Sequence, residues 1–273
     1  KRDKWRRLWP MRAETAMPQW IFGMSTVGST EKGLLAITCE QGEWSIKSFD
    51  MEGNIQTFDQ PFNDLSGLNA QGDKAVCIAS HPTQSQCLLE ISLNSGEWIK
   101  CSANKKILSD NQISIPEVIW FKGFNDESTH AWYYPPINYK KNPAPLLVKS
   151  HSGPTGMART GLNLAIQFWT SRGWGVVDVN YGGSSGFGRS YRERLNRRWG
   201  VVDVYDCAAA AKYLVACGKA DSNYIAIEGG SAGGFTTLSC LCFTNTFKVG
   251  ACRYGVSDLI SLAKDTHRFE AGY

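Results

Sequence analysis

The pentapeptide Gly229-Gly230-Ser231-Ala232-Gly233 constrains this 273-residue chain more than any other feature, because of what stands on either side of it. The apolar run 224–227 has the composition of a buried strand, and residues 234–242 have that of a helix. A G-x-S-x-G motif between a strand and a helix is typical of a nucleophile elbow, a strained turn that exposes the serine hydroxyl. We expect the turn to be so tight that only glycine fits at Gly229 and Gly233.

This context predicts that Ser231 is a nucleophile. The turn would also aim the backbone N–H of Ala232 at the position where an oxyanion forms. The alternative is a glycine-rich turn with an incidental serine, which the flanking strand and helix disfavour.

Composition excludes several classes of protein. A net charge of +4 is too small to indicate nucleic acid binding, and no apolar run approaches the length of a membrane span. The nine cysteines are scattered without the spacing of a disulfide framework or a zinc site, so we expect reduced thiols, a cytoplasmic location and no metal or cofactor.

Residues 1–108 have the pattern of short strands of alternating polarity. Two segments resemble each other, and their turn glycines, Gly53 and Gly96, lie 96 − 53 = 43 residues apart. That period is typical of a four-stranded propeller blade, so the segment is predicted to be part of a β-propeller. An antiparallel β-sandwich stays open as the alternative.

The polar segment 109–117 is predicted to be a linker, and the pattern of predicted strands and helices changes after it. Residues 118–124 and 130–136 indicate a β-hairpin, and from about residue 145 strands alternate with helices, as in a parallel sheet with crossover helices. One helix is expected from about Val204 to Cys217, with Asp203 as N-cap and Asp206 in a variant capping box.

The glycine-rich loop 182–188 has the spacing G-G-x-x-G-x-G, which matches neither a dinucleotide-binding motif nor a Walker A loop. We expect it to cross the top of the sheet near the elbow.

Four motifs in order carry a resemblance to a known family. They are HSGP at 151–154, NYGGSSGFGRSYRERL at 180–195, WGVVDVYD at 199–206 and GGSAGG at 229–234. Together they resemble the prolyl oligopeptidase family of serine peptidases, and within it the dipeptidyl-aminopeptidase and acylaminoacyl-peptidase branch. The resemblance implies β-propeller blades followed by an α/β-hydrolase domain at 118–273.

The resemblance also implies roles for particular residues. Ser231 would attack a peptide carbonyl, the N–H groups of Gly153 and Ala232 would form the oxyanion hole, and Phe269 would lie near an apolar substrate pocket. His151 is expected to order the oxyanion loop rather than to act as a base.

In α/β-hydrolases the acid and the base of the triad follow the serine. Asp258 and His267 follow Ser231 too soon to be placed in these roles, because two further βα passages would have to come first. We therefore expect the triad acid and base beyond Tyr273, further blades before Lys1, and a chain that is inactive alone.

The predicted function is a serine peptidase that cleaves short peptides near their N-terminus. Two alternatives stay open: a carboxylesterase with the same elbow, and a catalytically silent protein that binds partners through its propeller. No nucleic acid or membrane partner is expected, and a homo-oligomer is left open.

Overall fold

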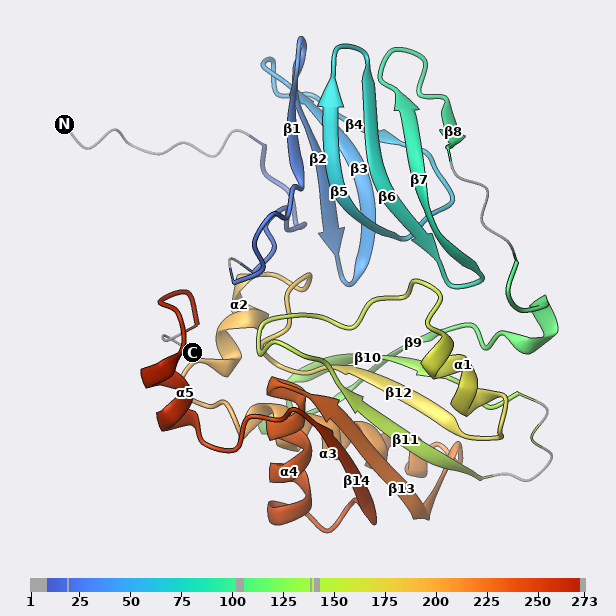
Figure 1. The fold of residues 1–273 in the computed structure, drawn as a ribbon, viewed down its shortest axis with the longest axis vertical. Coiled ribbons are helices and arrows are strands. Elements are labelled where there is room, and N and C mark those ends of the chain that lie inside the picture. The colour runs from blue at the N-terminus through green and yellow to red at the C-terminus, as the bar shows by residue number, and fades with distance from the viewer. Residues whose placement is uncertain (1–8, 19, 102–105, 138, 140–142, 271–273) are drawn as a thin grey trace.

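The computed structural model describes residues 9–18, 20–101, 106–137, 139 and 143–270, which form three β-sheets with helices around the third (Figure 1). Two four-stranded antiparallel sheets come first in the chain. A six-stranded mixed sheet follows and lies below them in the view of Figure 1. Within the described ranges, no helix is long and apolar enough to cross a membrane.

Each of the first two sheets is a simple meander whose strands pair in chain order. The strands of the first are β1 (Val27–Thr30), β2 (Gly33–Glu40), β3 (Glu43–Asp50) and β4 (Ile55–Phe58). Those of the second are β5 (Asp64–Gln71), β6 (Lys74–His81), β7 (Gln84–Ser92) and β8 (Trp98–Lys100).

The two meanders share one hydrophobic core. Alternate side chains such as Leu35, Ile37 and Ile46 from the first pack in the same cluster as Leu65 and Leu89 from the second. The N–H of Leu68 also donates to the carbonyl of Ser25, so the two sheets lie side by side. The turn glycines lie at equivalent places, Gly53 between β3 and β4 and Gly96 between β7 and β8.

After the meanders, residues 106–116 contain a single short 3₁₀ helix, η1 (Asp110–Gln112), and no strand. The predicted hairpin follows, with β9 (Glu117–Lys122) and β10 (Ser128–Tyr134) antiparallel and η2 (Phe124–Asp126) as their connection.

The six-stranded sheet has the order β14-β13-β11-β12-β10-β9. Four neighbouring strands of this sheet run parallel to one another: β11 (Ala144–Ser150), β12 (Gly175–Asn180), β13 (Ala220–Gly230) and β14 (Val249–Arg253). The main helices between them are α1 (Leu164–Thr170), α3 (Val202–Ala216) and α4 (Ala232–Phe243), while α2 (Arg189–Arg192), η3 (Glu193–Leu195) and α5 (Leu259–Asp265) are short.

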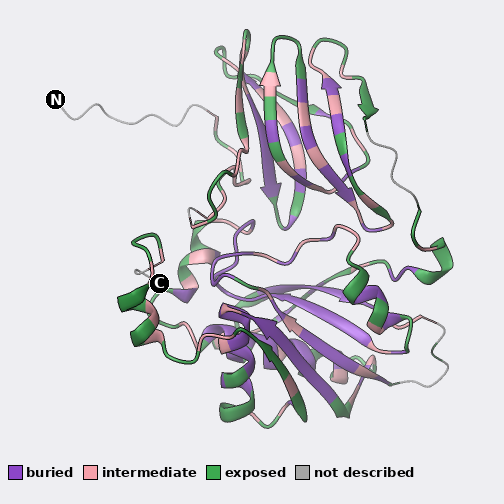
Figure 2. Cartoon of the chain, in the orientation of Figure 1, coloured by how far each residue is buried: buried purple, intermediate pink, exposed green. Residues whose placement is uncertain are grey.

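Helices cover both faces of this sheet. Leu146 and Val148 of β11 point into a core with α3, whereas Leu147 points to the other face and packs in a cluster with Ile166 of α1. The central strands β11 and β12 are accordingly buried on both sides, whereas the edge strand β14 is mostly exposed, as the colours in Figure 2 show. This double burial explains why the strands read as continuous apolar runs in the sequence.

The predicted N-cap of α3 is wrong. The helix begins at Val202 after Val201 as N-cap, so Asp203 lies inside its first turn. Asp203 and Asp206 turn inward instead of capping their own helix, and both are buried. The Asp206 carboxylate accepts hydrogen bonds from the N–H groups of Phe124 and Gly182, each at 2.7 Å.

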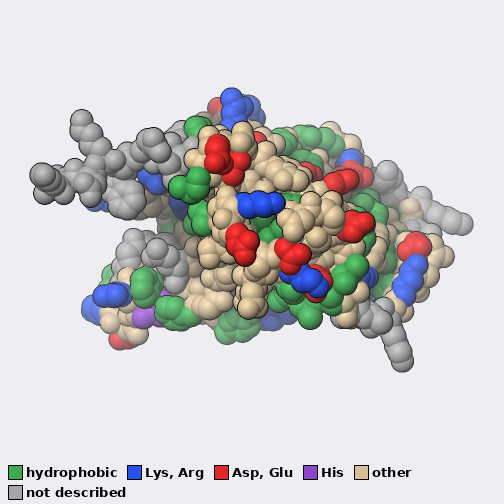
Figure 3. Space-filling view, turned by 90° about the horizontal axis from the view of Figure 1, so that it is seen from above, with side chains coloured by type: hydrophobic (Ala, Val, Ile, Leu, Met, Phe, Trp, Pro, Cys, Tyr) green, Lys and Arg blue, Asp and Glu red, His purple; other side chains and the backbone are tan. Residues whose placement is uncertain are grey.

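On the face shown in Figure 3, acidic and basic side chains are interspersed rather than gathered by sign. This distribution agrees with the small net charge of +4.

Candidate active site

Ser231 lies at the junction of β13 and α4 in a backbone conformation that L-residues rarely adopt. Its φ of 53° and ψ of −120° place it outside the helical and extended regions. Residues held in such regions persist only where the surrounding structure enforces the conformation, and they cluster at functional sites. Here the strand and the helix hold the turn, since the Ser231 N–H donates to the carbonyl of Arg253 at 3.1 Å and its own carbonyl accepts from Phe235 N–H.

The flanking glycines make the turn sterically feasible. A Cβ at Gly229 would lie well under 3.0 Å from the backbone of Gly233. A Cβ at Gly233 would overlap the carbonyl of Ser150 at the end of β11. Both neighbours are backbone atoms and cannot move aside, so the prediction that only glycine fits at these two positions is confirmed.

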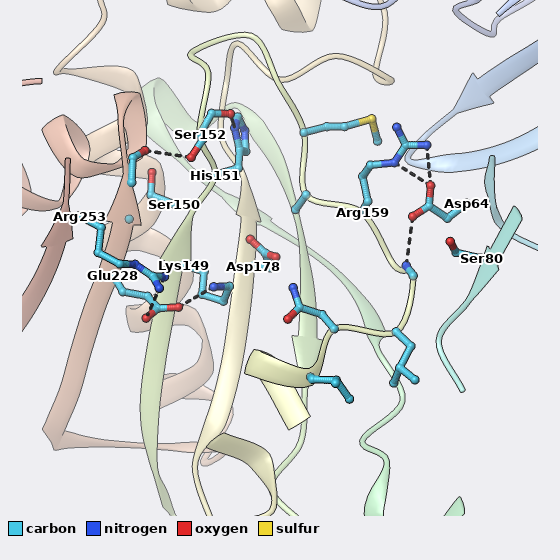
Figure 4. A pocket seen from close by; sticks show the side chains of 18 of the residues that line it. Asp64, Ser80, Lys149, Ser150, His151, Ser152, Arg159, Asp178, Glu228 and Arg253 are labelled. Carbon is cyan, nitrogen blue, oxygen red and sulfur yellow. Dashed lines mark hydrogen bonds and ion pairs between the residues drawn. The ribbon is translucent and has the colours of Figure 1, made fainter. Parts of the chain in front are cut away.

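The loop that follows β11 lies against the elbow. The hydroxyl of Ser152 donates to the carbonyl of Gly230 at 3.0 Å, which ties the loop to the residue before Ser231 (Figure 4). Gly153 has a φ of 70°, a left-handed conformation that favours glycine. The structure therefore brings Gly153 and the Ser231–Ala232 turn into one region of the molecule, at the carboxyl ends of neighbouring strands.

Ala232 is the first residue of α4, and the first N–H groups of a helix have no partner within it. Among the described residues, neither the Ala232 N–H nor the Gly153 N–H donates a hydrogen bond to the backbone. Their assignment as oxyanion donors stays a prediction that this geometry allows.

His151 belongs to the loop that follows β11 and is surrounded by its own hydrogen-bond partners. Its Nε2 lies 2.8 Å from Ser184 Oγ, its Nδ1 lies 3.1 Å from the carbonyl of Gly153, and its ring stacks on Tyr181 with centroids 4.3 Å apart. Burial lowers the pKa of His151 to about 4, so the ring is neutral near pH 7.

A cavity of about 550 Å³ opens beside the elbow, between the six-stranded sheet and the second meander (Figure 4). Its floor carries a row of charges across three strands, with Lys149 between Asp178 and Glu228. Lys149 forms an ion pair with Glu228 at 2.5 Å, and burial raises the pKa of Asp178 to about 6.

On the opposite wall of this cavity, Arg159 joins the two parts of the chain. Its Nε donates to Asp64 Oδ1 of β5 at 2.6 Å and its guanidinium lies 4.5 Å from the centre of the Trp44 ring. Asp64 also accepts from the N–H of Gly161. The cavity is thus closed on one side by the meanders.

The other predicted site residues lie elsewhere. Phe269 is 40% exposed, packs edge-on against Phe22 with ring centroids 5.8 Å apart, and does not line the cavity. Asp258 caps α5 by accepting from the N–H groups of Ile260 and Ser261, which is a structural role. The placement of Phe269 beside a substrate pocket stays a prediction.

The chain's four histidines all lie in the described part, and none of them hydrogen-bonds to Ser231. His81 bonds to Thr83, His130 is buried in β10 against Asn180, and His267 packs against Phe22 and Phe269. Within the part of the chain that the structure describes, no three His, Cys, Asp or Glu side chains gather as metal ligands.

Sequence reasoning missed the support of this site. It did not identify Tyr181 and Ser184 as partners of His151, nor the Arg159–Asp64 pair. The glycine-rich loop 182–188 was the available signal for Ser184, since that loop was expected to cross the sheet near the elbow. No local pattern indicates that Asp64, about 95 residues before Arg159, is its partner.

Comparison with known proteins gives consistent matches. Residues 160–273 match the model of the prolyl oligopeptidase family. A dipeptidyl peptidase family member 6 of Caenorhabditis elegans is 35% identical over 132 residues, which are 48% of this chain and 18% of that protein. An acylamino-acid-releasing enzyme of Oryza sativa is 33% identical over 116 residues, 42% of this chain and 15% of that enzyme.

The fold matches as well. A puromycin-hydrolyzing peptidase of Mycobacterium tuberculosis superposes with a TM-score of 0.90 and 36% identity over 97% of this chain. The chain spans 42% of that structure and less than half of the curated relatives named above. Residues 160–273 are therefore similar to the prolyl oligopeptidase family, as the sequence motifs indicated.

Proposed function

We propose that the whole protein is a serine peptidase that hydrolyses short peptides near their N-terminus through an acyl-enzyme on Ser231. The observation that carries the proposal is the strained Ser231 between β13 and α4, with glycines packed around it and the Gly153 loop hydrogen-bonded beside it. The peptidase relatives support the same reaction class.

In this mechanism, the Ser231 oxygen attacks the scissile carbonyl carbon and the amine leaves, which forms an ester that water then hydrolyses. The N–H groups of Gly153 and Ala232 stabilise the charge on the carbonyl oxygen, and removal of one such donor costs about 2.7–4 kcal/mol of barrier. A general base must accept the serine proton. No described histidine reaches Ser231, so this role is assigned to none of them.

The proposed architecture is a partial β-propeller at 1–108, a linker at 109–117 and part of an α/β-hydrolase domain at 118–273. The two four-stranded meanders have the form of propeller blades, and the six-stranded sheet has helices on both faces. In this arrangement the blades screen the active site from folded proteins, so the substrates are peptides.

The proposal covers substrates with either a free or an acylated N-terminus. One relative is named a dipeptidyl peptidase and another an acylamino-acid-releasing enzyme, so the names of the relatives do not decide between the two. A reducing compartment such as the cytoplasm is part of the proposal, because all nine cysteines are free thiols and four of them are exposed.

The test compares the whole protein with its Ser231→Ala variant. We expect the wild type to be labelled by a fluorophosphonate probe and to hydrolyse chromogenic dipeptide or N-acetyl-aminoacyl substrates, and the variant to do neither while unfolding at the same temperature. Faster turnover of simple esters than of every peptide would favour the carboxylesterase, and an unlabelled wild type would favour the silent binding protein.

A second measurement tests whether residues 1–108 keep large substrates away from Ser231. If the meanders cover the site, short peptides should be cleaved and casein-sized chains should not. Equal efficiency on both would contradict the proposed role of residues 1–108.

A further inference from the structure

We infer that Trp20, which precedes the first meander in the chain, is a positioning residue for the proposed reaction, because its indole ring packs directly on the backbone of Gly153. The inference rests on the proposed function, since that function gives the Gly153 N–H an oxyanion to bind. It gives residues 1–108 a part in the chemistry, in addition to keeping large substrates away from Ser231.

The indole of Trp20 leaves no space beside the α-carbon of Gly153. A Cβ added to Gly153 would lie 2.2 Å from both Cζ2 and Cη2 of the Trp20 ring. The indole Nε1 donates to Thr155 Oγ1 at 3.2 Å, and an indole N–H that is removed from water needs such an acceptor. The ring is therefore oriented by a hydrogen bond while its far edge contacts the glycine.

This contact joins two distant parts of the chain. Trp20 precedes β1, whereas Gly153 follows β11. The segment around Trp20 is tied to the first meander on both sides, because Glu14 exchanges backbone hydrogen bonds with Cys39 at 2.7 and 2.8 Å and the carbonyl of Thr26 accepts an N–H of β2 at 2.8 Å. In Figure 1 this segment is the dark blue stretch at the lower end of β1. Trp20 thus contacts the loop after β11 from a segment that is anchored to the meander.

The same segment has a second contact with the part of the chain that follows the meanders. The ring of Phe22 lies 5.6 Å from that of His267 and 5.8 Å from that of Phe269, measured between centroids. Phe22 is exposed and takes no part in the core of the meanders. The segment is therefore docked at two places, which hold Trp20 against Gly153.

The residue that accepts the indole hydrogen bond is itself fixed. Thr155 is buried, and its carbonyl accepts from the Ser185 hydroxyl at 2.7 Å. The Ser185 N–H donates to the carbonyl of Gly156 at 2.9 Å. The glycine-rich loop 182–188 thus supports the loop after β11, and Trp20 bonds to a residue whose position is already set.

Gly153 depends on such packing because it has no side chain to limit its own backbone, which has a φ of 70°. Its carbonyl accepts from the Gly156 N–H at 3.0 Å, so the loop itself holds that end of the residue. The indole blocks movement of the α-carbon. The Gly153 N–H, which donates to no backbone acceptor among the described residues, is thereby kept in one direction.

The experiment compares the whole protein with its Trp20→Ala variant. A misplacement of about 1 Å costs about 100-fold in rate, so we expect kcat to fall by about 10- to 100-fold. KM should stay within about twofold, because an oxyanion donor acts in the transition state and not on the bound peptide. Thermal unfolding of the variant shows whether the chain still folds.

Trp98→Ala is the matched control. Trp98 of β8 is also an indole of the meanders, but its ring packs on Phe62, with centroids 6.0 Å apart. This variant should keep kcat within about twofold of wild type. An unchanged kcat in Trp20→Ala, or an equal loss in Trp98→Ala, overturns the inference even if Ser231→Ala confirms the peptidase.

Two inhibitors separate positioning of the donor from general support of the site. A peptidyl trifluoromethyl ketone accepts the Ser231 oxygen at its carbonyl carbon, and its carbonyl oxygen becomes an oxyanion, whereas a product peptide binds without forming one. In Trp20→Ala, the affinity for the ketone should fall by the same factor as kcat/KM, and the affinity for the product peptide should stay within about twofold. An equal loss for both inhibitors overturns the inference.

A readout that does not depend on turnover or on the folding of Trp20→Ala is the fluorine NMR spectrum of the whole wild-type protein labelled with 5-fluorotryptophan. Trp20→Phe identifies the Trp20 signal, and we expect that signal to shift when the ketone adduct forms, while the Trp98 signal does not. An unmoved Trp20 signal overturns the inference. If the wild type neither binds the ketone nor hydrolyses peptides, the proposed function fails and the positioning role fails with it, while the packing of Trp20 on Gly153 stands.

Discussion

At the scale of single residues, the glycines of the elbow show how steric limits alone can specify a site. Gly229 and Gly233 approach backbone atoms so closely that no Cβ fits, and the resulting turn leaves Ser231 with a φ of 53°. His130 shows another residue-scale effect. It is fully buried in β10 among Trp120, Trp132 and Phe187, and burial lowers its pKa to about 3.

The first prediction concerns Gly233→Ala. The added methyl group would collide with the carbonyls of Ser150 and His151, so strand β11 and the elbow must separate. We expect a loss of about 1–3 kcal/mol in the free energy of unfolding and loss of probe labelling at Ser231.

Gly96→Ala is its control, because that turn glycine has a φ of 76° but nothing within 4 Å of a Cβ. It should cost about 1–2 kcal/mol of backbone strain and leave labelling intact. Normal labelling of Gly233→Ala would contradict the steric argument.

The second prediction concerns acid stability. The folded state keeps His130 neutral, whereas the unfolded chain protonates it below its ordinary pKa of 6.5. The unfolded state therefore binds more protons between pH 6.5 and about 3, and stability falls as the pH falls through that range, by up to about 1.4 kcal/mol per pH unit.

Replacing His130 with Gln should remove this contribution and flatten the dependence. Asp178 and Asp203, whose pKa values burial raises to about 6, act in the opposite sense, so the difference between wild type and variant is the quantity to measure. Denaturant unfolding at pH 7, 6, 5 and 4 supplies it, and parallel curves would refute the assignment.

At the scale of elements, α3 is joined to its surroundings through its first two turns. Asp203 accepts from the Gly200 N–H at 2.7 Å and from the hydroxyl of Thr236 in α4 at 2.5 Å. Asp206 accepts from Phe124 in the β9–β10 connection and from Gly182 after β12. One helix thus fixes a hairpin, a loop and the helix behind the elbow.

The third prediction is that Asp206→Ala destabilises the fold strongly. The buried N–H of Gly182 and the partly buried N–H of Phe124 would lose their acceptor, and each unsatisfied group costs about 1–3 kcal/mol. We expect a loss of about 2–5 kcal/mol in the free energy of unfolding.

Asp206→Asn retains one acceptor oxygen and should fall between wild type and Asp206→Ala. Lys212→Ala, an exposed substitution on the same helix, should stay within about 0.5 kcal/mol of wild type. An Asp206→Ala variant as stable as Lys212→Ala would show that water satisfies both N–H groups.

At the scale of the whole molecule, the meanders and the six-stranded sheet meet through a few polar contacts beside the cavity. The Arg159–Asp64 pair is one of them, and its side chains are 25% and 14% exposed. Glu14 makes another contact, since it pairs with Arg192 and accepts from the Gly186 N–H in the glycine-rich loop.

The fourth prediction uses a double-mutant cycle on Asp64→Asn and Arg159→Met. Because the pair is partly shielded from solvent and bonded through more than one atom, we expect a coupling of about 1–3 kcal/mol in the free energy of unfolding. Lys74–Glu90, an exposed ion pair within one meander, is the comparison and should couple by less than about 1 kcal/mol. Equal coupling in the two cycles would mean that the contact between the sheets is as solvated as the surface.

Much of the fold was within reach of the sequence alone, because it follows from local rules. Strand alternation, turn glycines such as Gly53 and Gly96, and the strand–glycine–serine–helix order each depend on residues within about ten positions of one another. The elbow is the strongest case, since its steric demand at Gly229 and Gly233 is a property of the turn itself. The strand before it was predicted too short, as β13 extends over Ala220–Gly230.

Only the tertiary structure decided which distant groups meet. Asp203 and Asp206 follow the pattern of a helix cap, yet their carboxylates bond to groups as far as 82 residues away because burial of α3 places them against other elements. The same holds for His151 with Ser184 and for Arg159 with Asp64. Neighbouring residues determine the backbone conformation through steric limits. The partners of buried polar groups depend instead on how the crossover connections place distant elements, and no local sequence pattern indicates those partners.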